Sequence, residues 1–491
     1  MKSRTGILLF LFVIACMMHV ISSHSQTIQL KNGETIEGEI VQSDTTHTTV
    51  HVKYGDISLQ NEDIATISAS TKPKSESPVD PLAATFIHQP KPANSELSPR
   101  SRGPVLFTPS DTITLEEVEK RAVLYFWEQS NPNNGLVKDR SRQGAPCSIA
   151  ASGFGLAVLC IGAERGWLDT QAVRKRIETM LTFFNERVGQ QRGFFYHFLN
   201  MNSGQREWSS EISSIDNAWL MAGVLFASEY YKGTVLEKRA NMIFDRVDWP
   251  WMLNGGSTFC LQWKPEGGFS PGRWDTYAEH PLLYLMAMGA PSHPIPKSCW
   301  RAWSRKPKAY SGHRYIHNPQ ESLFVYLFSH AWIDFRGKKD SGINYWTNSV
   351  QAIKANRDFT LSQKKIFKTY EKNIWGLTET DGPLGYKHYG AVPNGHDGTI
   401  APYAMLSSIN FVPALSTDSL QALIKKYASQ IWGPYGFTSG FNRDRKWYSK
   451  EYVGIHQGLI ALMLENYHSG FIWKKMMKNP VIREGLKRAK L

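Results

Sequence analysis

Apolar side chains recur at helical intervals over most of the chain from residue 114 onward. In TLEEVEKRAVLYFWEQS, Thr114 and Glu117 have the spacing of a capping box, and the apolar residues that follow lie three or four positions apart. Similar stretches predict about eleven further helices. These cover residues 148–165, 170–188, 213–231, 234–247, 276–289, 319–333, 343–359, 400–410, 417–430, 451–467 and 471–478.

Several of these helices are apolar on almost every side, which predicts burial on both faces. In SIAASGFGLAVLCIGAERGWL, the small residues Ala150, Ala151, Gly153 and Gly155 would let neighbouring helices approach closely. About a dozen helices that alternate between buried and amphipathic types predict a mainly α fold with two concentric rings, the (α/α)6 toroid. An α-solenoid would require a repeated sequence period, and none is visible.

A different pattern precedes the helices. Residues 27 to 69 form short alternating runs rich in β-branched residues and separated by NGE, SDTTH and YGD turns, which predicts four or five strands in a small SH3-like or Sm-like module over 26–70. Residues 71–110 are rich in Pro and Ser and lack periodicity, as is typical of a linker. The helical domain is therefore expected at 111–491.

The first 25 residues have the features of a signal peptide. Lys2 and Arg4 precede one apolar run, and small polar residues follow it up to Ser25. We therefore expect export to the periplasm or beyond. VIAC, ending at Cys16, also resembles a lipobox, so a membrane-anchored lipoprotein is the alternative. No later stretch approaches the roughly 20 apolar residues of a membrane-spanning helix.

Charge, cysteine content and motif spacing argue against a nucleic-acid-binding protein, a disulfide-built scaffold and a metal or cofactor enzyme. The net charge of +13 is concentrated in the C-terminal segment and in residues 297 to 308, without a basic stripe interleaved with aromatics, so no nucleic-acid partner is expected. Beyond Cys16 there are four cysteines without C-x-x-C spacing, too few for a disulfide scaffold, although one or two disulfides fit. Histidines lack H-E-x-x-H spacing, and no P-loop, nucleophile elbow or dinucleotide fingerprint is present. We expect no metal and no cofactor.

Long loops rich in Trp, Tyr, Gly and acidic residues connect the helices, and a toroid would gather them at one end. Aromatic faces stack on sugar rings while carboxylates bind hydroxyls. Hydrolysis of a glycosidic bond needs one protonated carboxyl and one ionised partner. We predict Glu211 as the acid, its pKa raised by burial near Trp208, and Asp139 as the base, with Asp397 as its rival.

Each acidic candidate has a structural alternative. Asp216 follows Ser213 by three residues and could cap a helix. Asp139 could form an ion pair with Arg140, and Asp397 could form a turn before Thr399. The predicted substrate-binding residues are Asp216, Trp208, Trp274, Tyr277, Glu279, Trp375, Tyr386, His388, Asp397 and Trp447.

Several ordered motifs resemble a known family. They include YFWEQSNPNNGLVKDRS, GFFYHFLNMNSGQREWSSEISSID, LQWKPEGGF, IWGLTETDGPLGY, DGTIAP and LENYHSGFIW, and the match runs from about Thr114 to about Trp473. The chain is similar to the bacterial glucoamylase-like family that contains the endo-β-1,2-glucanases of glycoside hydrolase family 144. The resemblance implies an (α/α)6 barrel, metal-independent and inverting cleavage of β-1,2-linked glucan or sophoro-oligosaccharides, and export to the periplasm.

In the resembling family, the acidic residues of GLVKDRS and SSEISSID line the cleft. For an inverting enzyme we expect the two catalytic carboxyls to lie roughly 6.5–9.5 Å apart, or to be linked by water or a substrate hydroxyl. This chain departs from the family pattern at Asn217, Trp219, Ser439, Gly440 and His456. A hydrolase of another bacterial β-glucan, or a non-catalytic glycan-binding surface protein, is therefore the alternative.

Overall fold

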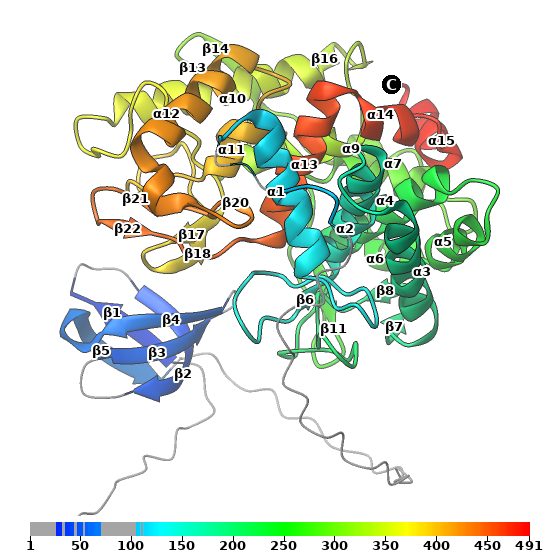
Figure 1. Cartoon of the computed structure of the whole chain (residues 1–491), viewed down its shortest axis with the longest axis horizontal. Coiled ribbons are helices and arrows are strands. Elements are labelled where there is room, and N and C mark those ends of the chain that lie inside the picture. Colours follow the sequence, from blue (N-terminus) through cyan, green and yellow to red (C-terminus); the bar gives the residue numbers. More distant parts are fainter. Residues whose placement is uncertain are drawn as a thin grey trace, which may run out of the picture. The chain divides into compact units, whose positions relative to one another are not determined.

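The computed structural model describes residues 26–31, 35–43, 47–52, 55–69, 105–108, 110 and 112–491. The described residues fall into two compact units, one holding a small sheet and the other holding the helices (Figure 1). The predicted signal peptide with Cys16, and most of the predicted linker, lie outside the described residues.

The small unit is an antiparallel sheet in the order β4-β3-β2-β1-β5. Alternation with a period of two points Ile28 and Leu30 to the same side, where they pack with Val50 and Leu59 in a core separate from that of the helices. The strands predicted from the alternating pattern are thus present. They are β1 (Gln26–Leu30), β2 (Thr35–Ser43), β3 (His47–Val52), β4 (Gly55–Gln60) and β5 (Ile64–Ala69).

The large unit is mainly helical, with short two- or three-residue strands in its loops (Figure 1). Its helices are α1 (Leu115–Glu128), α2 (Ile149–Glu164), α3 (Thr170–Glu186), α4 (Ser214–Tyr230), α5 (Val235–Asp245), α6 (Trp249–Leu253), α7 (Pro281–Gly289), α8 (Cys299–Ala302), α9 (Phe328–Trp332), α10 (Tyr345–Ser362), α11 (Pro402–Ser407), α12 (Pro413–Ile431), α13 (Gly454–His468), α14 (Phe471–Met476) and α15 (Pro480–Ala489).

Most helices predicted from periodicity are present, with three informative differences. The helix predicted at 276–289 begins only at Pro281, which is favoured in the first turn because its missing N–H is not needed there. The helix predicted at 319–333 is divided into a short 3-10 turn (Leu323–Tyr326) and α9. Helix α15 was not predicted, because its many Lys and Arg residues obscure the apolar face that Ile482 and Leu486 bury.

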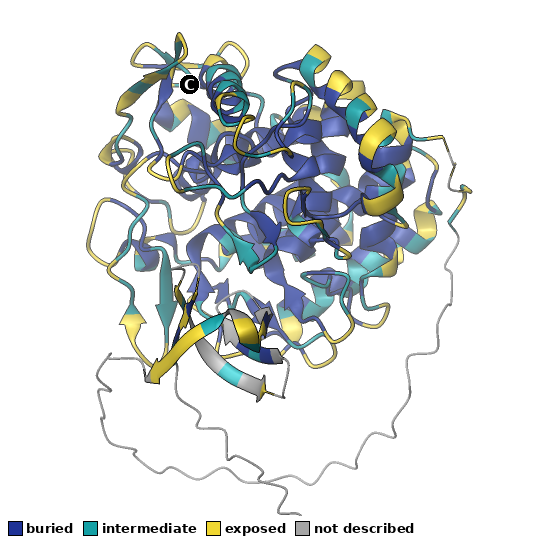
Figure 2. Ribbon diagram, turned by 90° about the vertical axis from the view of Figure 1, so that its left-hand side faces the viewer, coloured by how far each residue is buried: buried dark blue, intermediate teal, exposed yellow. Residues whose placement is uncertain are grey.

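Helices α2 and α4 form the centre of the domain and cross almost in backbone contact. A Cβ atom added at Gly223 would lie 2.0 Å from the carbonyl oxygen of Gly153, and one added at Gly153 would lie 2.3 Å from that of Trp219. The predicted close approach at Gly153 is therefore confirmed. Buried residues are concentrated in such inner helices, while the outer helices also carry exposed residues (Figure 2).

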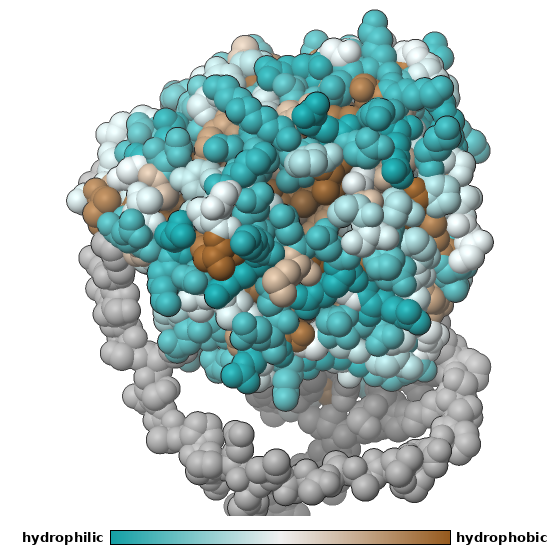
Figure 3. All heavy atoms as spheres, turned by 90° about the vertical axis from the view of Figure 1, so that its right-hand side faces the viewer, coloured by the Kyte–Doolittle hydropathy of each residue, from teal (hydrophilic) through white to brown (hydrophobic). Residues whose placement is uncertain are grey.

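The outside of the molecule shows no extended apolar surface on the face drawn in Figure 3, where apolar side chains form small separate groups among hydrophilic ones. Within the part of the chain that the structure describes, no helix combines the length and apolarity that crossing a bilayer demands. Cys147, Cys160, Cys260 and Cys299 are all buried free thiols, so these four form no disulfide.

Candidate active site

Three chain segments meet where the buried helices α2, α4 and α13 begin. The backbone N–H of Ile149, at the start of α2, donates to the carbonyl oxygen of His197 (3.1 Å), and that of His197 donates to the carbonyl oxygen of Glu211 (2.8 Å). The N–H of Gly454, at the start of α13, donates to the carbonyl oxygen of Asp139 (2.6 Å). These hydrogen bonds hold segments distant in sequence at one end of the inner helices.

His197 bridges two carboxyl groups from different positions around the start of α4. Its Nδ1 lies 3.1 Å from Oε1 of Glu211, and its Nε2 lies 3.2 Å from Oδ1 of Asp216. The ring stacks on Phe198 with centroids 3.9 Å apart. Burial alone would lower the pKa of His197, but Asp216 and Glu211, with a contribution from Asp139, outweigh burial and raise it to about 9. The imidazole is therefore protonated at neutral pH and donates from both nitrogens.

Arg140 organises a second group of carboxylates. Its guanidinium lies 3.0 Å from Asp139, 3.1 Å from Asp381 and 3.1 Å from Glu451. Although burial opposes the charge, Asp381, Asp139 and Glu451 together raise the pKa of Arg140 well above its usual range. The hydroxyl of Ser439 donates a further hydrogen bond to Asp381. These residues, called the Arg140 cluster below, come from three segments: Asp139 and Arg140 precede α2, Asp381 follows α10, and Ser439 and Glu451 precede α13.

Glu279 is the third element of the site. It lies two residues before α7 and is 7% exposed. Burial raises its pKa to about 8, its own backbone N–H opposes the rise and the charge of Asp216 adds to it. At neutral pH Glu279 is therefore mostly protonated. Because Asp216 acts electrostatically on both His197 and Glu279, all three belong to one neighbourhood.

The site thus contains a proton-holding half and an ionised half. His197 and Glu279 keep protons at neutral pH, while Asp139, Asp381 and Glu451 share the single positive charge of Arg140. Asp139 also acts electrostatically on His197, so the halves adjoin. Glu211, which contacts His197, and Asp139, which contacts Arg140, are thus carboxyl groups in two different electrostatic surroundings, and hydrolysis of a glycosidic bond requires two carboxyl groups with different roles.

The predicted aromatic contacts separate into two classes. Trp208 is 42% exposed, and its ring centroid lies 5.3 Å from that of Phe198 beside His197. Trp274 is partly buried, and its Nε1 donates to the hydroxyl of Ser214 (2.8 Å) at the start of α4. Tyr277 and Trp375 are instead 1% and 0% exposed within the core, so neither ring offers a face to a sugar in this structure.

The remaining predicted residues lie in other loops. Tyr386 is half-buried in β18 (Gly385–Lys387), and Trp447 is half-buried in β22 (Trp447–Tyr448). His388 is exposed and pairs through Nδ1 with Glu379. Asp397 accepts a hydrogen bond from the N–H of Thr399 (3.0 Å), which is the turn-forming contact given above as its alternative role.

Sequence reasoning missed part of this arrangement. Asp139 does make the ion pair with Arg140 that its sequence neighbours suggested, and Asp216 follows the capping residue Ser213, whose hydroxyl accepts from its N–H (3.3 Å). The bridging position of His197 and the contribution of Glu451 were not predicted. No local signal identifies them, because their partners lie in other segments.

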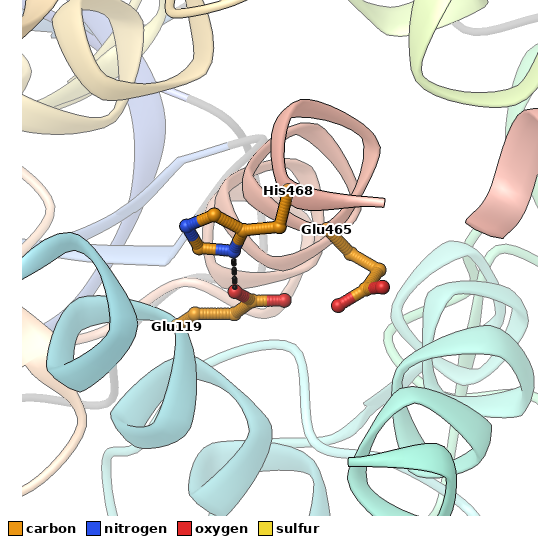
Figure 4. A group of neighbouring side chains, drawn as sticks. All are labelled: Glu119, Glu465 and His468. Carbon is orange, nitrogen blue, oxygen red and sulfur yellow. Dashed lines mark hydrogen bonds and ion pairs between the residues drawn. The ribbon is translucent and has the colours of Figure 1, made fainter. Parts of the chain in front are cut away.

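One further group has the composition of a metal site. Glu119 of α1 and Glu465 and His468 of α13 bring their ligand atoms within 4.8 Å of one another (Figure 4). Arg165 already supplies positive charge there: its Nε lies 2.9 Å from Glu465 and its Nη2 lies 2.9 Å from Nδ1 of His468. This group is best explained as a charge network that joins α1, α2 and α13.

Comparison with known proteins agrees with the fold. Residues 271–480 match the Glycoamylase family model, described as "Putative glucoamylase". An exo β-1,2-glucooligosaccharide sophorohydrolase (non-reducing end) from Parabacteroides distasonis is 23% identical over 424 residues, which are 77% of this chain and 58% of that protein. The chain thus spans less than two thirds of this curated relative.

Solved structures show the same architecture. An endo-β-1,2-glucanase from Chitinophaga pinensis, in complex with sophorotriose and glucose, is 26% identical with a TM-score of 0.71, covering 77% of this chain and 98% of that chain. An endo-β-1,2-glucanase from Talaromyces funiculosus, in complex with β-1,2-glucan, shares only the fold, at 13% identity and a TM-score of 0.56, covering 77% and 91%. The predicted resemblance to the glucoamylase-like family and its helical (α/α) toroid is confirmed.

Proposed function

We propose that this protein, a relative of the glucoamylase-like β-1,2-glucanases in sequence and in fold, is an exported glycoside hydrolase that cleaves β-1,2-linked glucan or sophoro-oligosaccharides. One observation carries the proposal. His197, Glu211 and Asp216 adjoin the Arg140 cluster at the start of the inner helices, so that proton-bearing and ionised groups meet in one site. The substrates named for the relatives suggest the linkage.

In the proposed reaction, Glu211 donates its proton to the oxygen of the glycosidic bond as the bond to the anomeric carbon breaks. Asp139 accepts a proton from a water molecule, whose oxygen forms the new bond to the same carbon from the opposite face of the ring. One water is consumed and the anomeric configuration inverts. The guanidinium of Arg140 lies 3.0 Å from the carboxylate of Asp139 and fixes its position.

The substrate would be held by exposed aromatic rings and by polar groups around the site. Trp208 is the strongest aromatic candidate, because its side chain is 42% exposed beside the Phe198–His197 stack. Trp274 and Trp447 are half-buried and are the further aromatic candidates. Glu279, neutral at physiological pH, could donate a hydrogen bond to a sugar hydroxyl.

The remaining parts of the chain complete the proposal. Residues 1–25 would direct export to the periplasm or the medium, with lipidation of Cys16 as the alternative that tethers the protein to a membrane. The sheet unit would be an SH3-like or Sm-like accessory module joined by the linker at 71–110. The helical domain, 111–491, would close as six helix pairs, the (α/α)6 form of the toroid.

The test compares linear β-1,2-glucan and sophoro-oligosaccharides with β-1,3- and β-1,4-glucans, measuring new reducing ends. We expect release from the β-1,2-linked substrates, with the α-anomer formed first as followed by NMR. Glu211→Gln should abolish turnover while calorimetry still detects oligosaccharide binding. Glu237→Gln, in the first turn of α5, is the matched control and should behave as wild type.

Other outcomes would change the proposal in defined ways. Activity confined to a different β-glucan would replace the substrate and keep the hydrolase. Binding without turnover by the wild type would indicate a glycan-binding protein. Full activity in Glu211→Gln would remove Glu211 from the mechanism.

A further inference from the structure

The contacts of Glu211 raise a chemical difficulty for an acid catalyst. Its carboxyl lies 3.1 Å from His197, which is an imidazolium at neutral pH. A neighbouring cation favours the ionised form of a carboxyl and would take from Glu211 the proton that it must donate. If His197 were an isolated cation, it would therefore keep Glu211 ionised and prevent it from acting as the acid.

The other side of the imidazole resolves this difficulty. Nε2 of His197 lies 3.2 Å from Asp216, almost the same distance as Nδ1 from Glu211. The side chains of His197, Glu211 and Asp216 are 14%, 14% and 16% exposed, so water screens their charges only partly. The negative charge of Asp216 offsets the positive charge of His197, and Glu211 then faces a nearly neutral pair.

We propose that Asp216 and His197 form a charge-compensated support for Glu211, in which His197 orients the acid and Asp216 cancels the charge that would otherwise ionise it. The inference rests on the function proposed above and deepens it. In this account Asp216 and His197 are positioning residues, because they act on the sugar only through Glu211.

Other charged groups around the triad do not supply this compensation. Arg206 acts electrostatically on Glu211, but its own charge is balanced by Glu266, whose Oε2 lies 3.0 Å from Nη2. Asp139 also favours the charged form of His197, but it lies 3.0 Å from Arg140. Glu279 is mostly neutral below pH 8. Asp216 is thus the anion in direct contact with the imidazolium on the side away from Glu211.

The position of Asp216 in α4 serves this role. Its N–H donates to the hydroxyl of Ser213, which caps the helix and fixes Asp216 in the first turn. The backbone hydrogen bond from His197 to Glu211 (2.8 Å) independently fixes the relative positions of those two residues. The positions of Asp216, His197 and Glu211 are therefore each fixed by a hydrogen bond of the backbone.

The test is the pH dependence of kcat/KM on a β-1,2-glucan oligosaccharide. In Asp216→Asn the imidazolium is no longer compensated, so the alkaline limb should move to lower pH by about one unit, which is a roughly fivefold loss at the midpoint of the wild-type limb and approaches tenfold above it. In the double variant Asp216→Asn/His197→Gln the cation is absent, and the limb should return close to its wild-type position. Glu237→Gln, an acidic first-turn residue of another helix, controls for the loss of a helix-terminal charge.

Two results would overturn the inference. An unmoved alkaline limb in Asp216→Asn, with only KM raised, would make Asp216 a direct sugar contact. An equal displacement with and without His197 would show that the compensation does not pass through the imidazole. If wild type cleaves no glycan at all, the function proposed above fails instead.

A second measurement needs only one variant and does not depend on activity. NMR titration of the wild-type histidines, with His197 assigned by its absence from the His197→Gln spectrum, should show His197 protonated through pH 8. A neutral His197 at pH 7 would overturn the charged support whether or not the variants retain activity.

Discussion

Replacing Gly223 by alanine tests whether the close crossing of α2 and α4 fixes the positions of the site residues at the start of these helices. In an ordinary helix, Gly→Ala stabilises by about 1 kcal/mol because alanine has the higher helix propensity. Here the new Cβ would lie 2.0 Å from the carbonyl oxygen of Gly153, whereas ordinary contacts begin at 3.4 Å. The two helices would have to separate by more than 1 Å at a contact of backbone with backbone.

Overpacking of this kind costs about 1–3 kcal/mol and here meets an atom that cannot rotate away. Because that atom belongs to the backbone, we take the upper part of this range, about 2–3 kcal/mol, and expect Gly223→Ala to lower the free energy of unfolding by about 1–2 kcal/mol after the gain in propensity. Because Asp216 lies on α4 and the start of α2 binds the backbone of His197, a displacement of about 1 Å should also lower kcat/KM by about 100-fold.

Urea unfolding followed by tryptophan fluorescence measures the first quantity, and reducing-end release measures the second. Gly189→Ala is the control, because its Cβ would meet nothing within 4 Å. A Gly223→Ala protein as stable as wild type, with activity within twofold, would refute the argument that this crossing fixes the site.

Three further predictions follow from the buried polar groups. Arg140→Gln should lower the free energy of unfolding in urea by about 3–5 kcal/mol, because it leaves three carboxylates without their shared cation; a loss below 1 kcal/mol would contradict this. The pKa of Glu279 is raised to about 8, so its contribution to the free energy of unfolding is fully present below about pH 4.5 and is lost as pH rises towards 8. Glu279→Gln should remove this fall of stability with pH, and at pH 8 its free energy of unfolding should exceed that of wild type by up to a few kcal/mol. Curves of stability against pH that run parallel for the two proteins would contradict this. Burial raises the pKa of Cys147 to about 12 and leaves all four described thiols inaccessible, so peptide mapping after maleimide treatment should find them unlabelled in the native protein and labelled in urea.

The helical architecture could be predicted because it follows from local patterns. Periodic apolar residues located most of the helices, and the small residues around Gly153 correctly indicated a close helix crossing. Helix α15 was not predicted because its basic residues suggested an exposed surface, although Ile482 and Leu486 are buried. Burial of a narrow apolar face depends on what packs against it, which one segment does not reveal.

The site could be predicted only in part. Glu211, Asp139 and Asp216 were chosen as candidates because they lie in polar stretches beside apolar helices and in motifs that resemble the family, and the structure places Glu211 and Asp216 on either side of His197. The roles of His197 and Arg140 arise from partners up to 311 residues away, as in the pair of Arg140 with Glu451. Aromatic residues were the least informative signal, since Trp208 is exposed beside the site while Trp375 is fully buried.

The central claim is that Glu211 meets the scissile oxygen at the point where the His197 and Arg140 groups adjoin. The most direct measurement is a crystal structure of Glu211→Gln with a sophoro-oligosaccharide long enough to span the site. The account predicts that a glycosidic oxygen lies within hydrogen-bonding distance of the side chain at position 211, about 2.7–3.2 Å. A glycan bound elsewhere, with no glycosidic oxygen near that side chain, would contradict it.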